Sequence, residues 1–396
     1  MGERPVDVSL GALVKFFPAR QIEEILRANK REEKRRRKLP SLELMYLLIA
    51  LGLYASEGCR AVLRRVLVRR GSAAEDLDRI SSDSAISQGR SRLGWKPIRD
   101  LYQSVVRPIA TRKTIGAMYR RWRLVTLDGS TLDLADTSRN ERAFGRPGSS
   151  RGKAAFPQLR WVSLLENGTH VLFGAEMGHY RTGEKTLAKK VIPKLPADAL
   201  CMADRNFFSY VLWNVALATG AALLWRVSKN LVLPKLRRLP DGSYLSKIYP
   251  SSKARAADRD GILVRLIEYR LEPGGTEVYR LLCSILDWKK APGVQLADLY
   301  SKRWTIETVL GEIKTRLRGA RVVLRSKRPD LVRQDFYGLL LAHFGVRALM
   351  LEAALQENIN PSDLSFLHAV RTIDSYLPLY LSFFPAKQKA LAITLV

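Results

Sequence analysis

The sequence predicts an α/β protein in which helical segments lie on either side of a strand-rich middle. Basic residues with helical spacing fill the first part of the chain, strand-like runs begin after Arg121, and helical patterns return after Val294. The chain has 396 residues, of which 46% are hydrophobic, so it can form two or three domains with a large core. It contains no internal repeat and no low-complexity linker.

The charge balance indicates a polyanionic partner. The chain has 67 Lys and Arg residues against 38 Asp and Glu residues, which gives a net charge of +29. A globular protein with this imbalance repels itself unless a polyanion balances it, and nucleic acid is the usual one. A ribosomal or membrane-surface protein could be equally basic, so charge by itself leaves the activity open.

Other features of the composition argue against several classes of protein. The three cysteines are far apart and lack metal-ligand spacing, which favours neither a disulfide framework nor a zinc site. No run reaches the roughly 18 apolar residues of a membrane span, and the N-terminus lacks the apolar core of a signal peptide. No phosphate-binding loop with Walker spacing is present. We therefore expect a cytoplasmic protein with no membrane partner and no nucleotide.

Residues 1–110 are predicted to form a helical, basic DNA-binding domain. The predicted helices follow Pro18, run from Ser41 as N-cap to Tyr54, and cover residues 58–70. Between the first two lies a strongly basic run that contains Arg35, Arg36 and Arg37. Short helices with basic faces suit docking into the major groove of DNA. The alternative is that these charged side chains are only the solvent-exposed faces of the helices.

The strand-rich middle is predicted from short apolar or alternating runs. Its candidate strands are 123–127, 159–166, 170–177, 199–203, 223–227, 244–249, 261–271 and 277–286, and its candidate helices are 184–192 and 207–219. Asn167-Gly168 is a strong hairpin-turn signal. The stretch 222–290 has the character of a β-rich insertion. Beyond it, we expect a long helix over 294–317 and helices over 339–351 and 361–380.

Two acidic residues follow short apolar strands. Asp128 comes after the first candidate strand and Asp204 after the strand 199–203. Carboxylates at the carboxyl ends of adjacent strands point into one crevice, where they repel each other unless a cation lies between them. Hard oxygen ligands favour Mg²⁺ or Mn²⁺, and two such ions can drive cleavage of a phosphodiester bond. Each aspartate could also be a turn former, and Asp133 and Asp136 are alternatives for the first acid.

The predicted helix over 294–317 offers a third carboxylate. Tyr300, Arg303, Glu307 and Lys314 have offsets of 0, 3, 7 and 14 residues. At roughly 100° per residue they fall within about 60° of one another, so a regular helix presents them on one face. Gly311 lies on the same face and would allow a close backbone approach. Glu307 would thus lie between two cations, and a DNA phosphate could use both.

These residues resemble a known family. The spacing Tyr300-x2-Arg303-x3-Glu307-x6-Lys314 resembles the YREK signature of insertion-sequence-four family DDE transposases, which include the transposon-five transposase. Leu127-Asp128-Gly129-Ser130-Thr131 resembles the first acidic motif of that family, and Ala203-Asp204-Arg205-Asn206-Phe207 resembles the second. The three motifs occur in the family's order. The resemblance covers residues 120–345 firmly, and residues 9–110 only in general pattern.

The resemblance implies an RNase H-like core in two parts, residues 120–221 and 291–345, with the β-rich insertion 222–290 between them and C-terminal helices over 346–396. It makes Asp128, Asp204 and Glu307 the catalytic ligands of two Mg²⁺ or Mn²⁺ ions. It implies that Tyr300, Arg303 and Lys314 contact double-stranded DNA near the cleaved end. The expected activity is cut-and-paste transposition of an insertion sequence through a hairpin intermediate, with terminal inverted repeats and target DNA as partners and a homodimer as the paired complex.

One further residue follows from the resemblance. Relatives stack a flipped base on an aromatic residue of the insertion, and in the transposon-five transposase this aromatic is a Trp that lies 21 residues before the signature Tyr. Tyr279 occupies that position here. Two other functions stay open: a catalytically inactive, transposase-derived DNA-binding protein, and an RNase H-like nuclease without strand transfer.

Overall fold

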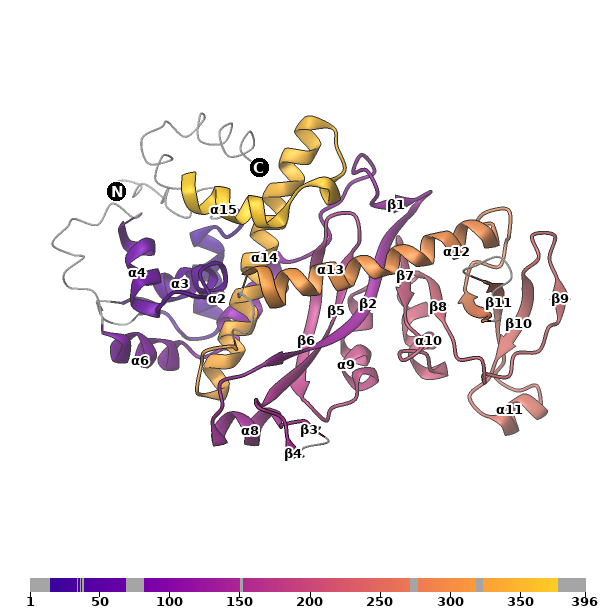
Figure 1. Ribbon diagram of the computed structural model, residues 1–396, viewed down its shortest axis with the longest axis horizontal. Coiled ribbons are helices and arrows are strands. Elements are labelled where there is room, and N and C mark those ends of the chain that lie inside the picture. The colour runs from indigo at the N-terminus through magenta and orange to yellow at the C-terminus, as the bar shows by residue number, and fades with distance from the viewer. Residues whose placement is uncertain are drawn as a thin grey trace. The chain divides into compact units, whose positions relative to one another are not determined.

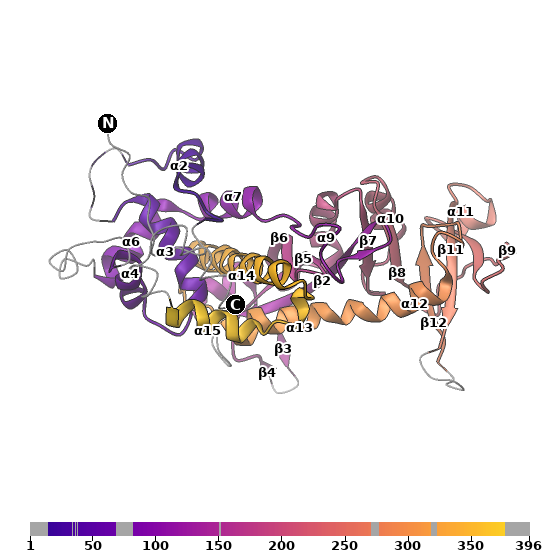
Figure 2. The ribbon, with the colours of Figure 1, turned by 90° about the horizontal axis from the view of Figure 1, so that it is seen from above.

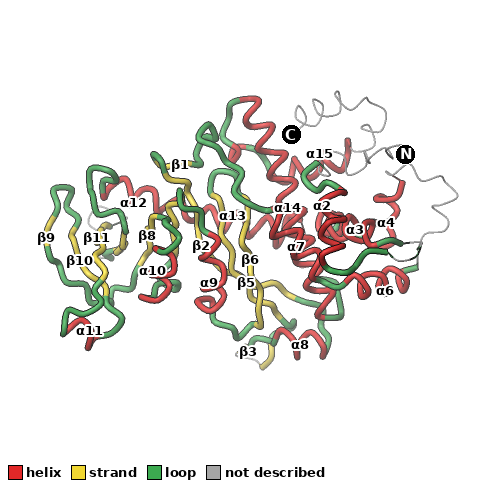
Figure 3. The backbone as a smooth tube through the Cα atoms, turned by 180° about the vertical axis from the view of Figure 1, so that it is seen from behind, coloured by secondary structure: helices red, strands yellow, loops and turns green. Residues whose placement is uncertain are grey.

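The computed structural model describes residues 15–33, 35, 37, 39–68, 82–149, 152–270, 277–317 and 323–376. The chain divides into two compact units. Unit 1 comprises Met1–Ile115, Thr131–Leu159 and Val309–Val396, and unit 2 comprises Gly116–Ser130 and Arg160–Thr308. Unit 1 is mainly helical, whereas strands dominate unit 2 (Figure 1 and Figure 3). The predicted mixed α/β fold is thus confirmed at this level.

Unit 1 is built around two buried helices. Its elements are α2 (Ala19–Ala28), α3 (Ser41–Leu53), α4 (Cys59–Val68), α6 (Asp83–Leu93), α7 (Lys96–Val105), α8 (Ser138–Phe144), β3 (Gly148–Ser149), β4 (Gly152–Lys153), the π-helix η3 (Glu312–Leu317), α14 (Pro329–Glu357), the 3₁₀ turn η4 (Pro361–Asp363) and α15 (Phe366–Tyr376). Helix α3 packs along α14, and α7 and α15 also pack on α14. Nearly every residue of α3 is buried.

Glycines allow the close crossing of α3 and α14. A Cβ added to Gly338 would lie 2.3 Å from the backbone oxygen of Leu48, and one added to Gly52 would lie 2.7 Å from the backbone oxygen of Gly338. By length and composition, α14 is the one helix among the described residues that could cross a membrane, yet 89% of its most apolar stretch is buried inside the protein. This burial is what the core helix of unit 1 requires.

A mixed sheet forms the centre of unit 2. Ten strands of the described residues belong to it, in the order β6-β5-β2-β7-β8-β12-β11-β10-β9, with β1 paired to β2. The strands are β1 (Met118–Tyr119), β2 (Trp122–Asp133), β5 (Gln158–Glu166), β6 (Val171–His179), β7 (Ala199–Ala203), β8 (Ala222–Arg226), β9 (Arg237–Arg238), β10 (Tyr244–Ile248), β11 (Ile262–Tyr269) and β12 (Tyr279–Cys283). Strands β2, β7 and β8 are parallel to one another. From β8 onward, neighbouring strands in the order β8-β12-β11-β10-β9 pair antiparallel.

Helices cover both faces of this sheet. The helical segments from α9 to α13 are α9 (Glu184–Val191), the 3₁₀ turn η1 (Ile192–Lys194), α10 (Tyr210–Leu217), α11 (Ser252–Ala256), α12 (Gly293–Ser301), the 3₁₀ turn η2 (Lys302–Trp304) and α13 (Thr305–Gly311). Figure 2 shows α9 and α10 on one face and α12 on the other. On the α10 face, the ring of Trp213 meets Trp225 edge to face at 5.3 Å. On the α12 face, Tyr300 packs with Leu124 and Leu200.

One predicted turn and one predicted helix cap differ from the prediction in the residues that form them. The hairpin between β5 and β6 is confirmed, but its left-handed residue is His170, with a φ of 61°. Gly168 is needed for space, because an added Cβ would lie 2.4 Å from the Cα of Ala117. Ser41 does not cap α3: Pro40 occupies the N-cap, and the Ser41 hydroxyl donates to a carboxylate oxygen of Glu33 at 3.0 Å.

The expected long helix over 294–317 is helical but not a regular α-helix. The turn η2 tightens it between α12 and α13, and η3 widens it after α13. Tyr300 and Arg303 are buried while Glu307 is exposed, so the four signature residues do not share one environment. The expected role of Gly311 is also wrong, because a Cβ added there meets nothing within 4 Å. The prediction assumed the same rotation per residue along the whole helix, and η2 and η3 do not have that rotation.

Candidate active site

Asp128 and Asp204 follow aligned positions of two parallel strands. The pairing of β2 with β7 ends at Leu127 and Ala203, which are direct partners. Asp204 comes directly after β7, as predicted, whereas Asp128 lies inside β2, because β2 continues to Asp133. Both carboxylates are half-buried. The parallel register therefore brings the first two predicted acids to one end of the sheet.

The electrostatics of Asp128 reflect this neighbourhood. The pKa of Asp128 is raised from 3.8 to about 6, chiefly by burial and also by the negative charges of Glu184 and Asp204, while the Gly129 amide and Arg303 act in the opposite direction. The Gly129 amide donates to Oδ1 of Asp128 at 2.7 Å, and Nη1 of Arg303 lies 3.4 Å from Oδ2. Two neighbouring carboxylates thus add to the effect of burial on Asp128 at this end of unit 2.

Glu184 is the acid that the sequence analysis did not assign. It is the first residue of α9, and its Oε1 would lie 3.0 Å from a Cβ placed on Gly129. The same Cβ would lie 3.2 Å from the backbone oxygen of Trp161, so a side chain at position 129 would displace the carboxylate. The available signal was an acid at the start of a predicted helix, which is too common to single out Glu184 without the fold.

Tyr300 and Arg303 lie beside the aspartates on the α12 side of the sheet. The Tyr300 hydroxyl donates to the backbone oxygen of Ala203 at 3.2 Å, directly before Asp204. The guanidinium carbon of Arg303 lies 5.7 Å from the centre of the Tyr300 ring. Burial raises the pKa of the Tyr300 hydroxyl, so it stays protonated. Both residues therefore have structural contacts at the carboxylates, and their contact with DNA stays a prediction.

Glu307 is not grouped with the aspartates in this arrangement. Its side chain is exposed on α13, and no three His, Cys, Asp or Glu side chains of the described residues lie close enough together to hold a metal ion. Lys314, the last residue of the signature, is half-buried in η3 of unit 1. The turn η2 also changes the rotation of the helix between Arg303 and Glu307 from that of a regular α-helix.

The carboxylates present nevertheless fit a hard divalent cation. Asp128 and Asp204 supply oxygen ligands of the type that Mg²⁺ and Mn²⁺ prefer. The negative charges of Asp204 and Glu184 disfavour the ionised form of Asp128. A cation between the carboxylates would reverse that effect. The donor chemistry is thus suited to a metal, although a third ligand is not yet in place.

Comparisons with known proteins place the chain in a family. Residues 7–103 match the family described as "Insertion element 4 transposase N-terminal", and residues 122–344 match the "Transposase DDE domain". The chain belongs to the IS4 family of DDE transposases. It is similar to the transposase InsG for insertion sequence element IS4 of Escherichia coli (strain K12), with 28% identity over 341 residues, which cover 84% of this chain and 75% of InsG.

A solved structure also matches this transposase. It is the piggyBac transposase synaptic complex with hairpin DNA, with a TM-score of 0.47 and 14% identity, and the match covers 99% of this chain and 86% of that one.

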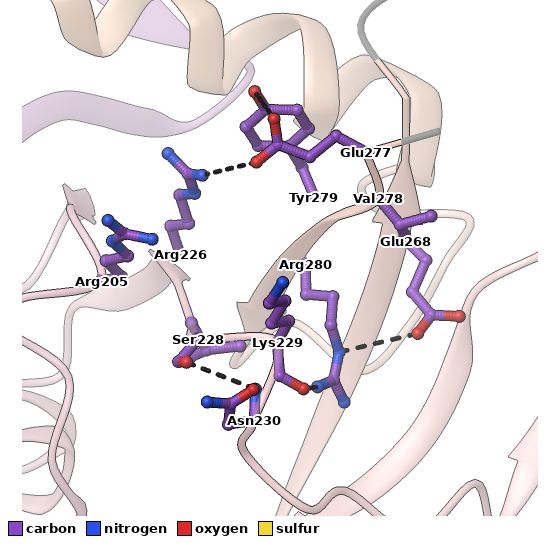
Figure 4. A pocket seen from close by; sticks show the side chains of 11 residues that line it. Arg205, Arg226, Ser228, Lys229, Asn230, Glu268, Glu277, Val278, Tyr279 and Arg280 are labelled. Carbon is purple, nitrogen blue, oxygen red and sulfur yellow. Dashed lines mark hydrogen bonds and ion pairs between the residues drawn. The ribbon is translucent and has the colours of Figure 1, made fainter. Parts of the chain in front are cut away.

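The transposase has a pocket at the carboxyl end of β8. Figure 4 shows this pocket, of about 870 Å³, with Arg205, Arg226, Lys229 and Tyr279 among its lining residues. Tyr279 is the first residue of β12, as predicted. The guanidinium carbon of Arg226 lies 4.5 Å from the centre of the Tyr279 ring, and Arg226 also pairs with Glu277 at 3.8 Å. Since Arg205 follows Asp204 directly, the pocket begins next to the acids.

The other predicted residues of the transposase lie in unit 1. Arg35 is exposed, Arg37 pairs with Glu33 at 2.9 Å, and Arg36 lies outside the described residues. The two alternatives for the first acid have partners there. Oδ1 of Asp133 accepts from Gln158 at 2.7 Å, and Asp136 forms an ion pair with Arg146.

Proposed function

We propose that this transposase cuts DNA at the ends of its insertion sequence and joins these ends to target DNA, and that its active site lies where the pairing of β2 with β7 ends. One observation supports the site above all others. The parallel register that ends at Leu127 and Ala203 brings Asp128 and Asp204 together, where burial and the charge of Asp204 disfavour the ionised form of Asp128. Such repulsion is costly in a protein without a cationic ligand, and it is a common feature of catalytic carboxylates.

Asp128, Asp204 and Glu307 would hold the divalent ions. Two Mg²⁺ or Mn²⁺ ions, when bound, supply an activated oxygen nucleophile and stabilise the leaving oxygen. Glu307 is proposed from its spacing in the signature, and its exposed carboxylate is accessible to a ligand. Because Glu307 is not grouped with the aspartates here, the proposal includes a movement of α13 when DNA binds.

The neighbouring residues have separate tasks. Arg303 favours the ionised form of Asp128, which is the form that can ligate a cation. Tyr300 ties α12 to the end of β7 through the Ala203 carbonyl, and this bond orients the chain before Asp204. Arg303 and Lys314 would also meet the phosphates of the cleaved end.

The reaction itself needs no covalent bond to the protein. Water attacks the phosphorus at the transposon end and leaves a free 3′-hydroxyl, which then attacks the opposite strand to form a hairpin. After the hairpin opens, the same hydroxyl attacks the target strand. Water breaks one phosphodiester bond in the first step and one when the hairpin opens, and each leaves a 3′-hydroxyl and a 5′-phosphate. Each attack by the 3′-hydroxyl forms one phosphodiester bond as it breaks another and releases the 3′-hydroxyl of the strand that is cut, so no step needs a nucleotide.

The pocket beside Tyr279 would receive a base turned out of the duplex near the cleaved bond. Tyr279 offers an aromatic ring, and Arg205, Arg226 and Lys229 offer cations for the backbone. Stacking on an aromatic ring offsets part of the cost of extruding a base. Binding of the terminal inverted repeats is assigned to the basic N-terminal residues, including Arg35, Arg36 and Arg37, and pairing of two ends to a homodimer. The proposal places the protein in the cytoplasm, where bacterial DNA lies.

Cleavage assays with Glu307→Gln test the site. The variant is expected to lose Mg²⁺-dependent cleavage of end DNA and to keep binding of that DNA, whereas the control Asp133→Asn should keep both. Cleavage that survives in Glu307→Gln removes Glu307 from the proposed site. A strand-transfer assay with wild-type protein separates the transposase from a nuclease without strand transfer, and the absence of any cleavage would indicate a retired DNA-binding protein.

A further inference from the structure

A buried carboxylate directly follows α13 and has no part in the proposed chemistry. Glu312 is the first residue of the π-helix η3, and its side chain is 1% exposed. Nε of Arg347 donates to its Oε2 at 3.1 Å, and Nη2 of Arg347 pairs with its Oε1. Nε2 of His343 lies 3.0 Å from the same Oε2. Both partners come from α14, so Glu312 ties η3 to the core helix of unit 1.

Helix α15 packs against this cluster. The ring of Phe366 in α15 lies 5.3 Å from the His343 ring, and the guanidinium carbon of Arg347 lies 5.0 Å from the centre of the Phe366 ring. Burial lowers the pKa of His343, while Glu312 acts in the opposite direction and Arg347 adds to the lowering. His343 is therefore neutral, and the buried cluster contains one negative and one positive charge. Removing one charge would leave the other buried without compensation.

The π form of η3 changes where Lys314 points. A π-helical turn contains one residue more than an α-helical turn, so the residues of η3 are rotated relative to those of a regular helix. In η3, Glu312, Ile313 and Leu317 are buried while Lys314 is half-buried. The contacts of Glu312 with α14 anchor the start of η3, and Lys314 lies two residues beyond this anchor. An α-helical register after Glu312 would turn Lys314 relative to that anchor.

We propose that Glu312 is a positioning residue: by docking on His343 and Arg347 it fixes η3 in the π form and so presents Lys314 to a DNA phosphate. The inference rests on the proposed contact of Lys314 with DNA. It also assigns a task to α14 and α15, which is to hold the segment that carries the last signature residue.

The salt dependence of DNA binding tests this role in the full-length protein without divalent ions. Each phosphate contact contributes about 0.9 to the slope of log K against log salt concentration, so Lys314→Gln should make the slope shallower by about that amount. Glu312→Gln should give the same change, and the double variant should give no further change. Loss of a negative charge alone would strengthen DNA binding, so weaker binding in Glu312→Gln cannot come from net charge.

Asp335→Asn is the matched control. Asp335 is a half-buried carboxylate on α14, and it pairs with Arg90 at 2.6 Å. Its loss should lower the melting temperature but leave the salt slope unchanged. If Glu312→Gln does not fold, as shown by circular dichroism, Glu312→Gln/Arg347→Gln takes its place, because it buries no uncompensated charge.

The outcomes separate the two proposals. A slope that changes in Lys314→Gln but in neither Glu312 variant overturns the positioning role and leaves the proposed DNA contact intact. A slope that Lys314→Gln does not change overturns both the contact and the positioning role. If the salt slopes of Lys314→Gln and Glu312→Gln change additively when the two substitutions are combined, the positioning role is also overturned, because the effects of independent sites add.

Discussion

Asp128→Asn should stabilise the metal-free protein while it abolishes cleavage. Asp128 has a pKa of about 6 in the fold against 3.8 as a free side chain, chiefly because it is buried. Between those two values the folded protein holds more protons than the unfolded chain, so its stability is complete below pH 4 and falls as the pH rises through 6. The ionised carboxylate therefore costs stability at neutral pH, and an amide of the same shape removes that cost.

The pKa difference sets the size of the effect. It corresponds to about 3 kcal/mol at pH 8 and roughly half of that at pH 5. Urea denaturation in the presence of a chelator, at both pH values, measures the free energy of unfolding of variant and wild type. The variant should gain more at pH 8 than at pH 5.

A control separates this local effect from the general charge of the protein. Asp133→Asn removes a negative charge from the same strand, and the new amide oxygen can still accept the hydrogen bond from Gln158. A gain in Asp128→Asn that is equal at both pH values, or that Asp133→Asn reproduces, would refute the reasoning. Such a result would mean that Asp128 is not surrounded by burial and negative charge as the structure describes.

Three further predictions concern other parts of the molecule. Gly338→Ala should cost ~1–3 kcal/mol in urea denaturation because its Cβ would lie 2.3 Å from a backbone oxygen of α3, whereas Gly311→Ala, which meets nothing within 4 Å, should gain ~0.5–1 kcal/mol. Arg303→Gln should raise the pKa of Asp128 further, since Arg303 lowers it, and so move the loss of stability to higher pH in the same urea assay. Tyr279→Ala should weaken binding to DNA with an unpaired base at the transposon end by ~1–3 kcal/mol, and Tyr279→Phe should not, as measured by fluorescence of 2-aminopurine at that base.

Local patterns in the sequence were sufficient for most of the longer strands, although not for the full extent of β2, and for the place of Asp204 directly after β7. The run 199–203 coincides with β7, and the hairpin at Asn167-Gly168 has the predicted place, because alternation and turn composition are properties of neighbouring residues. Asp204 follows from the same logic. The parallel pairing of β2 with β7 was the one long-range assumption, and the register at Leu127 and Ala203 agrees with it.

The signature helix could not be predicted in detail because tertiary contacts decide its form. An offset of 14 residues between Tyr300 and Lys314 defines a common face only if every turn has the same rotation. The widening at η3 depends on Glu312 and on its partner Arg347, which lies 35 residues farther along the chain. Glu184 was missed for a similar reason, since it lies against Gly129 only after β2 and α9 are both in place.

The position of Arg303 links the stability of the site to its activity. Its side chain is only 7% exposed and lies 3.4 Å from Asp128, so it supplies positive charge where the fold has gathered carboxylates. Without that charge, the pKa of Asp128 would rise and the protonated form, which cannot ligate a cation, would gain. A lysine would be a poor substitute, because a guanidinium is planar and can meet Asp128 while it lies over the Tyr300 ring. Arg303 thus has a structural role at Asp128 that is separate from its proposed contact with a DNA phosphate.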